Sequence, residues 1–78
     1  TMYNSKDKKE MIDFIENNGM LTGSDPMQWK ESECFFCWDS GSFFVSNHGE
    51  FFNLETAEEA IENFTKYAIE NNLTITFE

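Results

Sequence analysis

The chain has 78 residues, of which 15 are acidic and five are lysine, and its formal net charge is −10 at pH 7. A chain of this length forms one domain that buries about 60% of the surface of its unfolded state, which leaves little room for an enclosed active site. Direct nucleic-acid binding is excluded because it needs a basic surface, and no segment has the roughly 18 apolar residues of a membrane-spanning helix.

The first predicted element is a helix over residues 5–18, in which apolar side chains recur at helical spacing. Ser5 is expected to cap its start. Gly19 is expected to accept the left-handed backbone conformation past its end. Residues 19–32 show no clear period, and we predict that they are irregular.

Residues 33–54 are predicted to form a three-stranded antiparallel meander. The dipeptide Phe-Phe occurs three times in this segment at a spacing of eight residues, with a glycine between successive copies. This spacing is typical of short strands joined by tight hairpins. The copies begin at Phe35, Phe43 and Phe51, and the predicted two-residue hairpin loops are Ser40-Gly41 and His48-Gly49.

These loops fix a register, and side chains alternate between the two faces of a strand. The register places Trp38 opposite Phe43, Phe36 opposite Val45, Ser46 opposite Phe51, and Val45 opposite Phe52. Both faces of the meander are then apolar. The first face carries Phe36, Trp38, Phe43, Val45, Phe52 and Leu54. The second carries Phe35, Cys37, Phe44, Ser46, Phe51 and Asn53.

A second helix is predicted over residues 56–71, with Thr56 and Glu59 forming a capping box at its start. Residues 73–77 alternate between apolar and polar and are predicted to form a final strand. A right-handed crossover through the helix would return this strand parallel to a strand of the meander. The predicted fold class is α+β with the order α-β-β-β-α-β, in which one mixed sheet has helices packed on it.

Cys34 and Cys37 form a C-x-x-C motif, which suits a redox dithiol or half of a zinc site. In a strand, however, positions i and i+3 point to opposite faces. Zinc needs four ligands, and His48 is the only other soft candidate. We interpret the cysteines as reduced packing residues and His48 as a turn residue at a hairpin tip.

Motifs for catalysis are absent from the sequence. No nucleophile lies beside a base, the single histidine makes no triad, and the four glycines form no phosphate-binding loop. We therefore expect no catalytic residue, no cofactor and no bound metal, and we predict that the protein is not an enzyme.

Four glutamates at the start of the second predicted helix form an acidic strip: Glu55, Glu58, Glu59 and Glu62. Their spacing places them on one side of a helix. One interpretation is a solvated helix face that keeps the protein soluble. The other is a row of negative charge that occupies a basic groove, because a helix rises about 1.5 Å per residue and duplex DNA carries one charge per about 1.7 Å. Five further acidic residues would extend this field: Glu31, Glu33, Asp39, Glu50 and Glu70.

The second face of the meander is the other candidate surface. The first helix or residues 19–32 would bury Phe35, Phe44 and Phe51 if they packed on this face. Without such a cover, the three rings form an exposed patch suited to a protein partner or to a second copy of the chain. Acidic side chains around the patch would then steer a basic partner.

The small size, the acidic half from Glu31 to Glu78, the absence of arginine and the acidic strip together resemble the small acidic inhibitors encoded by phages, the anti-CRISPR and DNA-mimic proteins. The resemblance covers the chain as composition and includes no motif, so no functional residue is carried over. It implies an inhibitor that occupies the basic groove of a nucleic-acid-binding complex, such as a CRISPR effector, in the cytoplasm of a bacterial host. The alternatives are a protein-interaction module, including a homodimer, that uses the aromatic face, and a zinc or redox protein.

Overall fold

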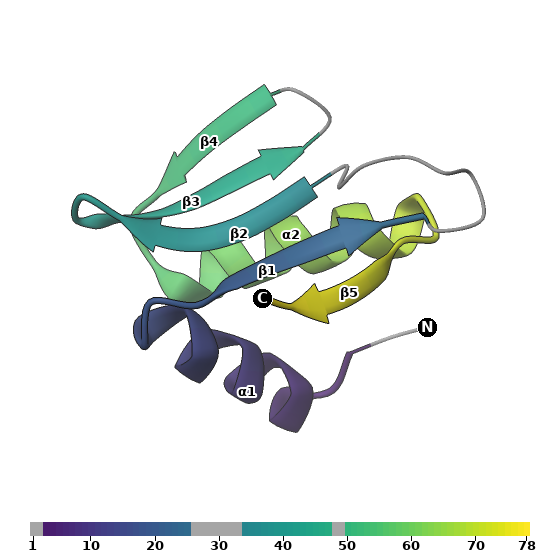
Figure 1. The fold of residues 1–78 in the computed structure, drawn as a ribbon, viewed down its shortest axis with the longest axis horizontal. Helices are drawn as coiled ribbons and strands as arrows, with labels where there is room; N and C mark the ends of the chain where they lie inside the picture. The colour runs from purple at the N-terminus through teal and green to yellow at the C-terminus, as the bar shows by residue number, and fades with distance from the viewer. Residues whose placement is uncertain (1–2, 26–33, 48–49) are drawn as a thin grey trace.

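In a computed structural model, the described part of the chain forms two layers, two helices and a five-stranded sheet (Figure 1). The structure describes residues 3–25, 34–47 and 50–78. The strand order in the sheet is β4-β3-β2-β1-β5. Along the chain the elements are α1 (Ser5–Glu16), β1 (Met20–Ser24), β2 (Cys34–Asp39), β3 (Ser42–Asn47), β4 (Glu50–Leu54), α2 (Ala57–Glu70) and β5 (Thr74–Phe77).

Both helices pack on the same face of the sheet, the one that carries Phe36 and Val45. Helix α2 contacts β2, β3 and β4, and α1 contacts β1, β2 and α2. Phe36 and Val45 are fully buried, as are Ile15 of α1 and Phe64 of α2. The Phe36 ring lies edge-to-face against Phe64, with the ring centroids 5.7 Å apart. The core therefore lies between the helices and the first face of the meander, and the predicted α+β class is confirmed.

The register of the meander is the predicted one. Trp38 pairs with Phe43 and Phe36 with Val45 across β2 and β3, and the two predicted pairs across β3 and β4 also form. The first hairpin turns at Ser40 and Gly41, whose φ angles are 51° and 89°. Two positive φ angles in a two-residue loop match the twist of the flanking strands. The predicted His48-Gly49 loop lies outside the described residues.

The prediction that residues 19–32 are irregular is wrong for β1, which pairs with both β2 and β5. The sequence of this strand has no alternating pattern because Leu21, Thr22 and Gly23 are all buried. Gly23 lies opposite Cys34, and a Cβ atom at Gly23 would meet the Cys34 Sγ at 2.5 Å. The strand is thus specified by contacts with distant segments. Residues 26–33 lie outside the described residues.

The predicted mixed sheet is also wrong, because β5 pairs antiparallel with β1 and every described strand pair is antiparallel. The crossover through α2 nevertheless returns β5 in the same direction as β2, since both strands are antiparallel to β1. The intervening β1 keeps these two parallel strands apart. The missed strand therefore changes the sheet from mixed to antiparallel.

The helix ends differ in detail from the predictions. Asn4, not Ser5, caps α1: its Oδ1 accepts from the Asp7 backbone N–H at 2.9 Å, and its own N–H donates to Asp7 Oδ2 at 3.2 Å. After α1 the left-handed residue is Asn18, with φ 67°, whereas Gly19 was expected there. An Asn can take this conformation and thereby end a helix.

Helix α2 begins one residue later than predicted and has Thr56 as its N-cap. The Thr56 side chain accepts from the Glu59 backbone N–H at 3.2 Å, which is one of the two contacts of the predicted capping box. The reciprocal contact, from the Thr56 N–H to the Glu59 side chain, is not among the hydrogen bonds of the described residues. Asn72, with φ 58°, ends this helix in the same way as Asn18 ends α1. The Leu73 N–H then donates to the Ala68 carbonyl at 2.8 Å and leads the chain into β5.

The close approach of Gly23 to Cys34 gives a test of the β1–β2 pairing. Gly23→Ala should lower the free energy of unfolding by about 1–3 kcal/mol, because extra volume strains a packed core. In the Gly23→Ala/Cys34→Ala double variant the clash is relieved, so the loss should be smaller than the sum of the two single losses. Urea unfolding of the four proteins measures this coupling.

The matched control is Gly19→Ala, whose Cβ would meet the Phe14 ring and not Cys34. Its loss should add to that of Cys34→Ala, because the two substitutions affect separate contacts. An additive result for Gly23 and Cys34 would contradict the described pairing of β1 with β2.

Candidate binding surfaces

The two candidate surfaces lie on opposite sides of the molecule. Helix α2 lies on the face of the sheet that carries Phe36, and the predicted aromatic patch is on the other face. The acidic residues of α2 therefore do not surround the aromatic patch. A single flat contact with a partner cannot use both surfaces.

The aromatic face brings Phe35, Phe44 and Phe51 together, as predicted. The rings of Phe35 and Phe44 are stacked, with centroids 6.2 Å apart and an interplanar angle of 6°. The Phe51 ring lies 5.6 Å from Phe44 and 6.1 Å from Phe35. Phe51 is 61% exposed, and the other two rings are half-buried. Since α1 and α2 both pack on the opposite face, neither helix covers this cluster.

Small polar side chains are buried beside the rings of this face. Ser46 pairs with both Phe35 and Phe51 and is 6% exposed. Thr22, which pairs with Phe35, is 5% exposed, and its hydroxyl donates to Glu78 Oε1 at 3.4 Å. The aromatic face is thus packed within itself, and of its three rings Phe51 is the most exposed to solvent.

The acidic strip is split by the start of α2. Glu55 precedes the N-cap and is not part of the helix, whereas Glu58 and Glu59 lie in its first turn and Glu62 one turn later. All four side chains are exposed. None of them forms an ion pair with a described residue. Their negative charge is therefore open to solvent and to a partner.

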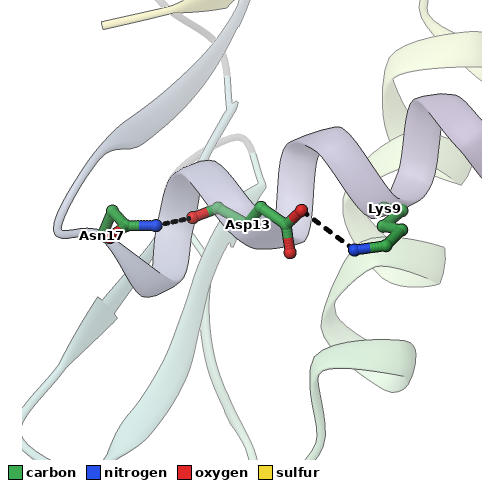
Figure 2. Close-up of polar contacts among 3 residues, drawn as sticks. All are labelled: Lys9, Asp13 and Asn17. Carbon is green, nitrogen blue, oxygen red and sulfur yellow. Dashed lines mark hydrogen bonds and ion pairs between the residues drawn. The ribbon is translucent and has the colours of Figure 1, made fainter.

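Lysines of α1 lie close to part of this strip. Lys8, Lys9, Glu58 and Glu62 all line one shallow groove of about 440 Å³ between the helices. The ion pair that the described residues form is within α1, between Lys9 Nζ and Asp13 Oδ2 at 3.1 Å (Figure 2). The lysines reduce the negative potential along the groove between α1 and α2.

Figure 2 shows polar contacts within α1. Asp13 accepts twice: its carboxylate pairs with Lys9, and its backbone carbonyl accepts from Asn17 Nδ2 at 2.7 Å. These contacts are exposed and contribute little stability, since a surface pair is worth about 0–1 kcal/mol. Lys9 and Asp13 line the groove with Glu58 and Glu62, so this pair lies beside the acidic strip and on the opposite side of the sheet from the aromatic cluster.

The other acidic candidates are scattered. Asp39 ends β2 on the aromatic face, opposite Ser42, and accepts a hydrogen bond from the Ser40 hydroxyl at 3.1 Å. Glu50 begins β4 opposite Asn47, on the face that the helices cover. Glu31 and Glu33 lie outside the described residues, and Glu70 is the last residue of α2, at the end opposite the acidic strip. Asp39 is thus the one described acidic candidate that shares a face with the aromatic cluster.

The two cysteines point to opposite faces of β2, as predicted. Cys34 is 1% exposed in the core, and Cys37 is half-buried on the aromatic face. Burial, and to a smaller extent the charge of Asp39, raises the pKa of the Cys37 thiol. Thiols on opposite faces of one strand cannot bind the same metal ion or form a disulfide with each other. Within the described residues no group of three metal-binding side chains is present, and His48 lies outside them.

The structure has two surface hollows that were not expected from the sequence. The larger, about 510 Å³, lies between α1 and β5 and is lined by Tyr3, Asp7 and Glu10 among others. Burial, then the charges of Asp7 and Cys34, raise the pKa of Tyr3. A second hollow of about 300 Å³ is lined by Glu16, Trp38, Phe43 and Glu55. Its residues come from segments far apart in the sequence, so no local pattern could have indicated it.

Fold and surfaces together define a small acidic α+β domain with helices on one face of an antiparallel sheet and an aromatic cluster on the other. Comparison with protein-family models, with curated proteins and with solved structures finds no match to this chain. Neither helix in the described part of the chain is long and apolar enough to cross a membrane.

Proposed function

We propose that this protein is a small acidic inhibitor that occupies the basic groove of a nucleic-acid-binding complex. The observation that carries the proposal is the open negative charge at the start of α2: Glu58, Glu59 and Glu62 are exposed and form no ion pair with a described residue. A lysine- or arginine-lined groove supplies the missing counter-charge. The formal net charge of −10 would steer the chain toward such a groove.

The carboxylates on α2 imitate the charge spacing of a nucleic acid. Glu58 and Glu62 lie one helical turn apart, and Glu59 is beside them on the outer side of the helix. A helix rises about 1.5 Å per residue, so these side chains present charge at a density similar to that of duplex DNA. The partner class is a basic protein complex of a bacterial cytoplasm, such as a CRISPR effector, and binding requires no catalytic step.

The lysines of α1 restrict the part of the acidic surface that attracts a basic partner. Lys8 and Lys9 line the groove that Glu58 and Glu62 border, so a basic partner is attracted mainly to the outer side of α2 and to the segment around Glu55. Removing these two positive charges should strengthen binding to a basic partner. Reversing the charge of the glutamates should weaken that binding, so the two sets of substitutions test the same interaction in opposite directions.

Charge reversal tests the proposal. The protein is immobilised and exposed to a bacterial lysate, and retained proteins are eluted with salt or with competing DNA and identified by mass spectrometry. We expect a nucleic-acid-binding complex that elutes with salt. Changing Glu58, Glu59 and Glu62 to Lys should weaken its retention at least about tenfold, since each tenfold loss corresponds to about 1.4 kcal/mol. Lys8→Gln/Lys9→Gln should strengthen it.

In the control variant Glu10, Glu70 and Glu78, which lie away from the start of α2, are changed to Lys, so the net charge changes by the same amount. It should reduce retention much less. Equal losses in the two triple variants would mean that net charge, and not α2, determines binding. A retained partner that resists high salt and tolerates the reversal at Glu58, Glu59 and Glu62 would contradict the proposal.

A second candidate function uses the aromatic face as a docking surface for a protein partner or a second copy. The observation that favours it is the exposure of Phe51 within a cluster of three rings, because an exposed aromatic patch is typical of an interface. Binding through this face would depend little on salt. The two candidates therefore differ in a measurable property.

Substitution of Phe51 distinguishes this second candidate. Phe51→Ser should change the free energy of unfolding by less than about 1 kcal/mol, because the side chain is mostly exposed. If the face is an interface, the variant loses self-association in sedimentation measured over a range of concentrations, or loses retention of the partner. A monomer at every concentration, with unchanged partner retention in the variant, would exclude the aromatic face.

A further inference from the structure

A small hollow lies where α1 ends, the β2–β3 hairpin turns and α2 begins, and these three segments meet at the same end of the molecule (Figure 1). Its volume is about 300 Å³, and its lining is two aromatic rings and two carboxylates. Ligand pockets span about 300–1,000 Å³, so this hollow suits one side chain and not a larger molecule. The lining residues are Glu16, Trp38, Phe43 and Glu55.

The aromatic side of the hollow is held by the core. The Trp38 ring lies edge-to-face against Phe43, with centroids 4.8 Å apart and an interplanar angle of 64°. Phe43 in turn packs edge-to-face on Phe36, which packs on Phe64 of α2. Phe43 is 9% exposed, but Trp38 is 41% exposed. A large indole thus remains accessible to solvent while its position is fixed by buried rings.

Three sources of negative potential converge on this indole. Glu16 and Glu55 are both exposed, and neither forms an ion pair with a described residue. Glu16 is the last residue of α1, where the helix end itself carries partial negative charge, and no basic residue lies in that last turn. Among the residues that the structure describes, no lysine lines this hollow, in contrast to the groove between α1 and α2. A cation is therefore the complementary ligand.

We propose that this hollow binds a cationic side chain of a protein partner, with arginine as the preferred residue. This proposal rests on the proposed function and adds to it the site that anchors the basic partner. A guanidinium group is planar, stacks on an aromatic ring and pairs with carboxylates through several donors. Trp38 supplies the ring, and Glu16 and Glu55 supply the carboxylates. Tryptophan and arginine are also the residues that most often dominate the energy of an interface.

A titration with capped arginine, N-acetyl-arginine N-methylamide, tests the site without the partner. The Trp38 indole N–H resonance of the ¹⁵N-labelled protein reports binding, and the Trp29→Phe variant assigns it. We expect a saturable shift with a dissociation constant in about the millimolar range, because a solvent-accessible cation–π contact is weak. Capped lysine should bind more weakly. Capped citrulline, which has the same shape without the charge, should give no saturable shift.

Substitution of the two carboxylates is the second arm. Glu16→Gln/Glu55→Gln should weaken arginine binding about tenfold at low salt, and Glu70→Gln, an exposed glutamate elsewhere on α2, should leave it unchanged. The spectrum of each variant checks that the fold is intact. Equal shifts with arginine and citrulline, or equal losses in the double variant and the Glu70 control, would overturn the proposal.

The two proposals fail separately. Arginine binding is measured on the isolated protein, and it should fall more in Glu16→Gln/Glu55→Gln than in the variant with Glu58, Glu59 and Glu62 reversed, because none of these three residues lines the hollow. If arginine binds as expected and no basic complex is retained from lysate, the proposed function is wrong and the site stands. If a complex is retained through α2 and arginine does not bind at Trp38, the anchor is wrong and the proposed function stands.

Discussion

The contact between Phe36 of β2 and Phe64 of α2 is the interaction on which the rest of the structure depends. Both side chains are fully buried, and they join the sheet to the helix layer. Truncating a buried Phe to Ala costs about 3–5 kcal/mol, which is comparable to the whole net stability expected of a domain of this size. Because side chains alternate along a strand, burying Phe36 turns Phe35 to the other face. The position of the aromatic cluster is thus a consequence of the core.

This one-sided core gives the molecule two different surfaces. The sheet surface is aromatic, carries one described acidic candidate, Asp39, and suits a contact that depends little on salt. The helix surface carries the open charge of α2 and suits a basic partner. The hollow at Trp38 belongs to the helix side, because Trp38 shares a face with Phe36 and extends beyond the cover of the helices. An aromatic anchor and negative charge therefore occur together on that side.

The meander and its register could be predicted from the sequence because they depend on local rules: three Phe-Phe copies, tight loops and alternation of side chains. The opposite orientation of Cys34 and Cys37 follows from the same alternation. β1 could not be predicted, because the contacts that favour glycine at position 23 come from Cys34 and Leu73, which are distant in the sequence. The hollow at Trp38 could not be predicted either, because it needs the ends of three elements to meet. Glu55 was predicted as part of the helical strip, and the Thr56 cap places it outside the helix.

The most direct test of the one-sided core is the solvent exposure of individual aromatic rings, measured by NMR with a soluble gadolinium complex that broadens the signals of exposed protons. The structure predicts strong broadening for Phe51, intermediate broadening for Phe35 and Phe44, and almost none for Phe36 and Phe64. Equal protection of the five rings would mean that both faces of the sheet are covered. That result would contradict the assignment of the second face as a surface that the described residues leave open.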